Sequence, residues 1–83
     1  MSEEDLILAL KAHTPAGAEA LYDQYAVRLF RVISSRVGDR VEAEQVLLEV
    51  FERIWQEIGS YDTVDCRLAV WIMAITRRLS KKK

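Results

Sequence analysis

The sequence has little of what most enzymes and metal proteins are built from. Its 83 residues include one cysteine, Cys66, and one distant histidine, His13, so the chain cannot form an internal disulfide and offers no set of metal ligands. It also lacks a glycine-rich phosphate loop, an HExxH motif and a nucleophile placed beside a base. We therefore expect no catalytic activity, no bound metal and no cofactor.

Long apolar runs are absent as well. No run approaches the roughly 20 residues that cross a bilayer, and the N-terminus, MSEEDLILALK, begins with acidic residues rather than with the basic segment of a signal peptide. The sequence predicts a cytoplasmic protein without a membrane partner. Hydrophobic residues make up 51% of the chain and charged residues 30%, which favours one small folded domain over disorder.

Cap signals divide the first half of the chain into two expected helices. Ser2 resembles an N-cap, and the apolar residues that follow predict a short helix reaching about His13. Thr14 and Pro15 form a second start signal, because proline is tolerated at the first helical position, and a long helix should run from there to about Arg36. Its expected buried stripe recurs at three- and four-residue steps: Ala18, Leu21, Tyr22, Tyr25, Leu29, Val32 and Ile33.

A glycine and an aspartate mark the next boundary. Gly38 is expected in the C-terminal cap of the second helix, and Asp39 with Glu42 resembles a capping box for a third. This helix should span roughly residues 40–58, with Gly59 as its stop.

The remaining segment predicts a loop and a fourth helix. Residues 60–66 lack periodicity, and Asp65 is the expected N-cap of a helix over about residues 66–79. No stretch alternates as a β-strand does. The sequence thus predicts an all-α fold, a compact bundle of about four helices. These are a short first helix, two long antiparallel helices and, after a loop, a basic C-terminal helix.

Charge is divided unevenly along the chain. Residues 1–66 carry six basic against thirteen acidic residues, a net charge of minus 7, whereas residues 67–83 carry six basic residues and no acidic one. Aromatic and apolar residues are interleaved with these basic residues, which suggests contact with a polyanion through one end of the molecule. The basic residues are Arg67, Arg77, Arg78, Lys81, Lys82 and Lys83.

One apolar residue stands out on the third predicted helix. At 100° per residue, Leu48 projects about 120° from the centre of the buried stripe, among glutamates. Two interpretations fit this position. Either the first helix covers a wide apolar stripe that includes Leu48, or Leu48 contacts another protein.

Three segments in order resemble region 2 of extracytoplasmic-function sigma factors. They are EALYDQYAVRLFRVI at 19–33, AEQVLLEVFERIWQEIGSYD at 43–62 and RLAVWIMAITRRLS at 67–80. The family pattern in the middle segment is AED, two residues, QEVF, a few residues and W. The spacing of Ala43, Glu44, Glu49, Val50, Phe51 and Trp55 reproduces this pattern.

The resemblance implies a function in transcription initiation. In such sigma factors the third helix docks on the clamp helices of the RNA polymerase beta-prime subunit. The last loop and helix engage the melted promoter minus-ten element and hold a flipped base of the non-template strand. By position, Gln45, Leu48, Glu49 and Glu52 would bind polymerase or another partner. The DNA-side residues would be Tyr61, Asp62, Arg67, Trp71, Arg77, Arg78 and Lys81, with Trp71 mainly holding the helix down.

The sequence also departs from the family pattern. Gln45 and Leu48 replace an acidic residue and a glutamine, Cys66 replaces a glycine, Ala69 replaces a bulky or basic residue, and Arg78 replaces an asparagine. We therefore expect charge-driven DNA contact with modest base specificity.

Other functions fit these departures. One alternative is a divergent interaction module that works with a separate polypeptide, such as a region-4 protein or an anti-sigma factor. Another is a helical protein whose basic end has no partner. We expect residues 1–83 to form a region 2-like domain without a region 4, either excised from a longer chain or free-standing.

Overall fold

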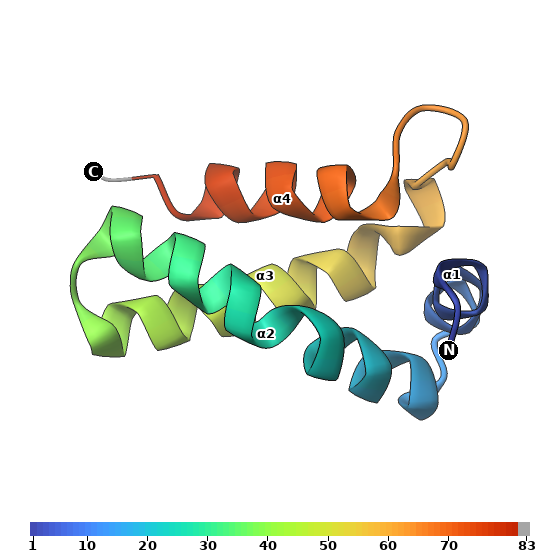
Figure 1. Cartoon of the computed structure of the whole chain (residues 1–83), viewed down its shortest axis with the longest axis horizontal. Coiled ribbons are helices and arrows are strands. Elements are labelled where there is room, and N and C mark those ends of the chain that lie inside the picture. The colour runs from blue at the N-terminus through green and yellow to red at the C-terminus, as the bar shows by residue number, and fades with distance from the viewer. Residues whose placement is uncertain (82–83) are drawn as a thin grey trace.

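The computed structural model describes residues 1–81 and consists of four α-helices and one short 3-10 helix (Figure 1). The elements are α1 (Glu3–Lys11), α2 (Pro15–Val37), α3 (Arg40–Glu57), η1 (Ile58–Ser60) and α4 (Leu68–Leu79). Within residues 1–81 there is no strand, which confirms the all-α prediction. Lys82 and Lys83, part of the predicted basic end, lie outside the described residues.

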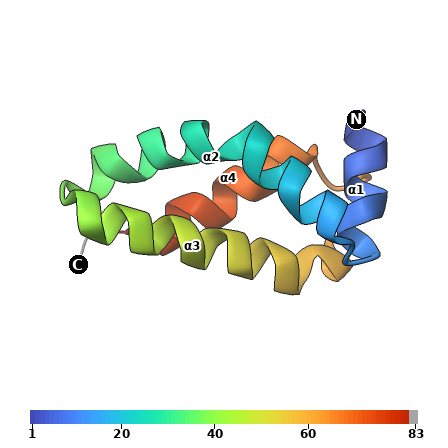
Figure 2. The ribbon, with the colours of Figure 1, turned by 90° about the horizontal axis from the view of Figure 1, so that it is seen from below.

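The two long helices form the body of the bundle. Helices α2 and α3 run antiparallel beside each other, α4 packs against both, and α1 crosses one end (Figures 1 and 2). The loop before α4 lies at the α1 end, and the C-terminal end of α4 lies near the turn between α2 and α3 (Figure 1). The residues with no exposed surface come from all four α-helices and η1, and the largest include Leu10, Leu29, Ile33, Val50, Ile54, Ile58, Leu68 and Ile72.

The expected helix starts are confirmed by their caps. The Ser2 hydroxyl accepts a hydrogen bond from the Asp5 amide at 3.1 Å, and the Asp39 carboxylate accepts one from the Val41 amide at 3.1 Å. These bonds satisfy amide groups that have no partner in the first helical turn. Gly38 ends α2 with φ 84°, as its cap position requires.

Two predicted boundary signals are wrong. Gly59 does not stop α3 in a left-handed conformation, because the chain continues from Glu57 into η1 with Gly59 inside it. Asp65 does not cap α4, which begins at Leu68 after an extended Arg67 and has no side-chain cap. The loop is closed instead by Asp62, whose carboxylate accepts a bond from the Val64 amide at 2.9 Å, as aspartate often does in turns.

Helix α1 is held against α2 at very short range. A Cβ built on Gly17 would lie 2.8 Å from the carbonyl carbon and 2.9 Å from the oxygen of Ala9, so the two helices meet where α2 has no side chain. The Thr14 hydroxyl, which caps α2, also donates to the Ala9 carbonyl at 3.1 Å. Position 17 therefore sets the distance between α1 and α2.

His13 fixes the turn between these two helices. It has a φ of 55°, unusual for a residue with a side chain, and its Nε2 lies 2.9 Å from the carbonyl oxygen of Trp55 on α3. Its ring meets the Trp55 ring edge-on at a centroid distance of 4.7 Å. His13 thus has a structural role in joining the α1–α2 turn to α3.

Candidate nucleic-acid and protein interfaces

The four predicted partner-binding residues share one face of α3. Gln45, Leu48, Glu49 and Glu52 are all exposed, and at about 100° per residue they fall within roughly a third of the helix circumference. Leu48 is 66% exposed, so the interpretation that α1 covers it is wrong: α1 crosses the far end of the bundle (Figure 1). An exposed leucine among glutamates remains available for contact with another protein.

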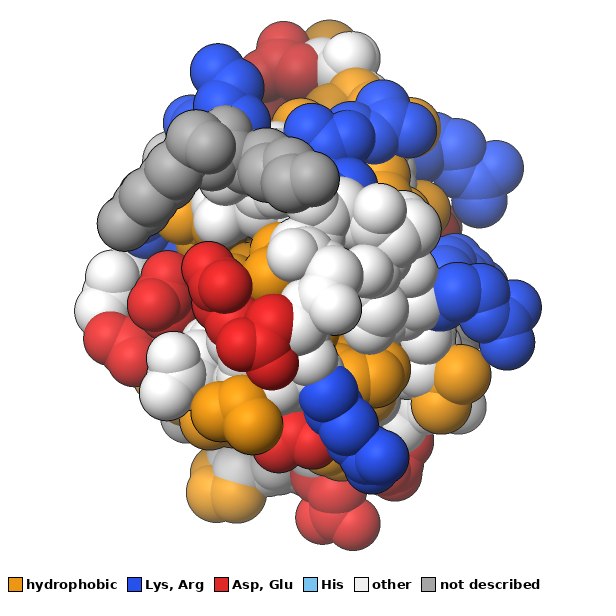
Figure 3. All heavy atoms as spheres, turned by 90° about the vertical axis from the view of Figure 1, so that its left-hand side faces the viewer, with side chains coloured by type: hydrophobic (Ala, Val, Ile, Leu, Met, Phe, Trp, Pro, Cys, Tyr) orange, Lys and Arg blue, Asp and Glu red, His pale blue; other side chains and the backbone are white. Residues whose placement is uncertain are grey.

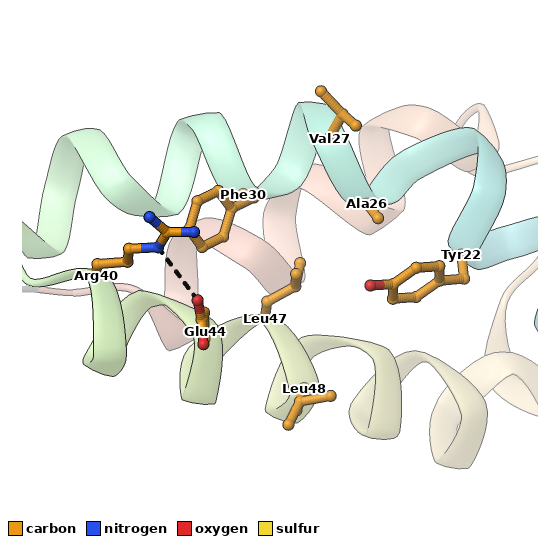
Figure 4. A pocket seen from close by; sticks show the side chains of 8 residues that line it. All are labelled: Tyr22, Ala26, Val27, Phe30, Arg40, Glu44, Leu47 and Leu48. Carbon is orange, nitrogen blue, oxygen red and sulfur yellow. Dashed lines mark hydrogen bonds and ion pairs between the residues drawn. The ribbon is translucent and has the colours of Figure 1, made fainter.

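Leu48 lies at the edge of an apolar groove between α2 and α3, with a volume of about 450 Å³. Phe30, Ala26 and Leu47 turn toward the space between the helices (Figure 4), and an ion pair between Arg40 and Glu44, 3.4 Å apart, lies beside them. The complete lining consists of Tyr22, Ala26, Val27, Phe30, Arg40, Glu44, Leu47 and Leu48.

The α2 side of this groove does not follow from the sequence pattern. Tyr22 was expected in the buried stripe, but its side chain is 51% exposed and its ring packs against Phe51 at a centroid distance of 5.3 Å. The reason is that Leu21 and Tyr25 already fill the core-facing positions of that part of α2. Val27 is 72% exposed. Its position in the helical repeat lies outside the buried stripe of α2, and this spacing could have predicted that it faces outward.

The loop before α4 is anchored from inside by Tyr61. This residue is 3% exposed, its hydroxyl donates to the Cys66 carbonyl at 2.7 Å, and its ring lies 5.2 Å from that of Trp71. Burial raises the pKa of the Tyr61 hydroxyl, and the nearby Cys66 thiol raises it further, so the phenol stays a neutral donor. In this conformation the Tyr61 ring is not free to stack on a base. The ring instead anchors the loop to α4, and direct contact of Tyr61 with DNA stays a prediction.

The rest of the loop is accessible. Asp62 and Val64 are exposed, and Cys66 is a partly buried free thiol. Within residues 1–81, His13 is the one non-glycine residue with a positive φ, so Cys66 meets no backbone strain where the family usually has glycine. The loop thus presents an exposed tip, residues 62–65, next to the buried Tyr61.

Basic side chains gather on α4. Arg67, Arg77, Arg78 and Lys81 are exposed, whereas Trp71 is partly buried, in keeping with its expected role of holding the helix down. Seen from the end where the C-terminus of α4 and the α2–α3 turn lie, most basic side chains are at the top and right, and most acidic ones are at the left and bottom (Figure 3). Helix α2 adds exposed arginines that were not among the predicted DNA-side residues: Arg28, Arg31 and Arg36.

Within the described part of the chain, residues 1–81, no three His, Cys, Asp or Glu side chains lie close enough together to hold a metal ion. In the same residues, no helix is both long and apolar enough to span a membrane. The exposed features of these residues are an acidic and apolar surface on α3 and a basic surface centred on α4.

A sequence model of sigma-70 region 2 matches residues 21–83. The chain belongs to the sigma-70 region 2 family. Among curated proteins it is similar to the ECF RNA polymerase sigma factor BldN of Streptomyces coelicolor, with 36% identity over 59 residues. These residues are 71% of this chain and 22% of that protein, so the chain spans about a fifth of its relative's length. No solved structure matches the chain.

The match to the sigma-70 region 2 family leaves out the first helix of this domain. Residues 21–83 include most of α2 and all of α3, the loop and α4. Helix α1 lies outside the matched residues, although its Leu6, Ile7 and Leu10 are buried in the same core. The sigma-70 region 2 domain described here therefore carries a packed N-terminal helix in addition to the matched part.

Proposed function

We propose that this sigma-70 region 2 domain acts in transcription initiation, without catalysis of its own. Its α3 surface binds the beta-prime clamp helices of core RNA polymerase, and α4 with the preceding loop binds the melted promoter minus-ten element. The observation that carries the proposal is the separation of charge between the two surfaces. The α3 surface presents Glu49 and Glu52, whereas Arg67, Arg77 and Arg78 are exposed on α4 or next to it.

This separation suits two different partners. An acidic surface repels the phosphates of nucleic acid and favours a basic protein, because complementary charge guides association. Exposed arginines neutralise phosphates and release counterions, and arginine side chains can also stack on unpaired bases. With Tyr61 buried, the DNA surface relies on charge more than on aromatic stacking. This supports the expectation of modest base specificity.

The DNA part of the proposal predicts salt-dependent binding. A single-stranded minus-ten oligonucleotide, followed by fluorescence anisotropy, should bind at low salt with an affinity that falls steeply as salt rises. Arg77→Ala and Arg78→Ala should each lower the slope of log affinity against log salt by about 0.7, the value for one phosphate on a single strand.

Arg40→Ala is the matched control for these two variants. It removes the same charge from α3, where Arg40 is exposed and paired with Glu44, so its slope should stay that of the wild type. If the wild-type domain shows no binding at low salt, the DNA part of the proposal is rejected. Equal effects of all three variants would mean that only net charge matters.

A second candidate function is favoured by the exposure of Leu48 and the groove beside it. In this alternative the domain works with a separate polypeptide, such as a region-4 protein or an anti-sigma factor, that packs an apolar side chain against Leu48. A leucine surrounded by glutamates contributes little to solubility, and a partner that covers it would gain the free energy of removing its apolar side chain from water.

The variant Leu48→Gln separates the two candidates. Glutamine is the residue that the family pattern has at this position, so binding to isolated beta-prime clamp helices should be kept or strengthened. Binding to a partner that packs on Leu48 should instead weaken about tenfold, as measured by isothermal titration. Val70→Gln, an equally polar change at an exposed position on α4, serves as the control and should alter neither affinity.

A further inference from the structure

The apolar groove beside Leu48 continues along the two long helices. A second hollow of about 330 Å³ lies next to it between α2 and α3, and Tyr22 lines both. Helix α4 packs on the other side of these helices, so it lies behind them when the groove faces the viewer (Figures 2 and 4). Within residues 1–81, no helix covers this face of α2 and α3.

Apolar and acidic side chains follow one another along the groove. Val27 and Leu48, at its apolar part, are 72% and 66% exposed. Toward the α1 end come three exposed acidic residues, Glu19 and Asp23 on α2 and Glu52 on α3. At 100° per residue, Glu19 and Asp23 lie in the arc of α2 that lines the groove. At 1.5 Å per residue they lie about 12 and 6 Å along the helix from Val27.

The outer face of α4, formed by Val70, Ala74 and Arg77, carries the complementary order. These three residues are exposed and recur at four- and three-residue steps, so they form one stripe opposite the buried side of the helix. Val70 is 59% exposed, and Arg77 lies about 10 Å further along the helix. An apolar part is thus followed by a cation at the distance at which the groove becomes acidic.

The charges on both surfaces are available to a partner. In the described residues 1–81, Arg77 forms no ion pair, and neither do Glu19, Asp23 and Glu52. The groove and the outer face of α4 lie on opposite sides of the molecule, so they can meet only between two copies. Two grooves placed face to face would instead bring two acidic surfaces together, which like-charge repulsion disfavours.

We propose that the domain binds a second copy of itself head to tail, with the outer face of α4 of one copy in the α2–α3 groove of the next. Val70 and Ala74 pack beside Val27 and Leu48, and Arg77 points toward the acidic part. Each copy keeps one free groove and one free α4, so the contact can repeat. One helix in one groove is a small contact, and we expect a Kd of roughly 0.1–1 mM.

This contact would regulate the domain. It covers α4 of one copy and Leu48 of another, the surfaces to which the proposed function assigns DNA and polymerase, so associated copies would be withheld from both. That consequence rests on the proposed function, whereas the association itself rests on the two complementary surfaces.

Sedimentation of the full chain, without DNA or polymerase, tests the association. In low salt, the weight-average mass of the wild type should roughly double when the total concentration equals Kd, as for an open chain of identical contacts. It should return toward that of the monomer as salt rises, because salt screens the charges. A wild type that stays monomeric at about 1 mM in low salt overturns the proposal.

Mixing two variants tests the head-to-tail geometry. Val27→Glu blocks the groove and Arg77→Glu reverses the charge of α4, so each variant alone should associate at least about tenfold more weakly than the wild type. Their mixture should form a complex of one copy of each and nothing larger, because one variant keeps its α4 and the other its groove. If the mixture forms no complex, or if Arg77→Glu alone associates as a groove-to-groove dimer would, the proposal is overturned.

Leu8→Glu and Arg31→Glu are the matched controls. They make the same charge changes at exposed positions on α1 and α2, outside both surfaces, and should associate as the wild type does. If they behave like Val27→Glu and Arg77→Glu, only net charge matters and the proposal fails. A wild type that associates but binds no oligonucleotide would reject the proposed DNA function and leave the self-association standing.

Discussion

Replacing Ile72 with alanine is expected to lower the free energy of unfolding by about 2–5 kcal/mol, the usual cost of truncating a fully buried isoleucine. Ile72 has no exposed surface and lies in the middle of α4, which packs against both α2 and α3. A domain of this size has about 5–15 kcal/mol of stability in total, so one substitution removes a large part of it. Urea unfolding followed by circular dichroism measures the change.

Val70→Ala is the control for this variant. Val70 is on the same helix but is 59% exposed, so the same kind of truncation should change the free energy of unfolding by less than about 0.5 kcal/mol. If both variants lost the same stability, α4 would not pack against the core through the face that carries Ile72. If neither did, α4 would contribute little to folding.

The variant Gly17→Ala is expected to destabilise the domain by about 1–3 kcal/mol, as overpacking commonly does. The new Cβ would meet the Ala9 carbonyl carbon at 2.8 Å, and this backbone group cannot rotate away as a flexible side chain could. Alanine is preferred over glycine in a helix by about 1 kcal/mol, but the clash outweighs this gain because α1 must move. Thermal unfolding and the NMR signals of Leu6 and Leu10 would show the displaced helix.

Gly59→Ala should have the opposite sign. A Cβ at Gly59 would meet nothing within 4 Å, and the residue does not have a positive φ. Removing glycine from such a position restricts the unfolded chain and stabilises a protein by about 0.4–1 kcal/mol. A stabilising Gly17→Ala would show that α1 is not packed against α2 at this point.

The helix starts could be predicted because their signals are local. Ser2, Thr14 and Asp39 cap the helix that directly follows each of them, and Gly38 provides the left-handed residue that ends α2. Asp65 looked like the same kind of signal, but a loop with two aspartates offers two ways to close. The one that forms uses Asp62.

The burial of individual residues was harder to predict because it depends on distant elements. Periodicity put Tyr22 in the core stripe, whereas the path of α3 leaves it at the edge of a groove. Tyr61 looked like part of an exposed loop, yet its ring fills the space between the end of α3 and the start of α4. The exposure of Leu48 depended on where α1 lies, which the close approach at Gly17 decides.

The interfaces were predicted in part. Helical spacing gathered the partner-facing residues of α3 on one side, and the run of basic residues indicated the surface of α4. The pairing of Glu3 with Arg67 could not be read from the sequence, because residues distant along the chain meet only after the bundle has formed.

The edge-on contact of His13 with Trp55 has a practical consequence. The chain has two tryptophans. Trp55 is touched by His13 in the turn between α1 and α2, with ring centroids 4.7 Å apart, and Trp71 is touched by Tyr61 at the start of the loop, at 5.2 Å. Each indole therefore contacts a different part of the fold through an aromatic neighbour. If one tryptophan is replaced by phenylalanine, the fluorescence emission of the other reports on one region alone. Trp55 then reports on the packing of the turn after α1, and Trp71 reports on the loop before α4.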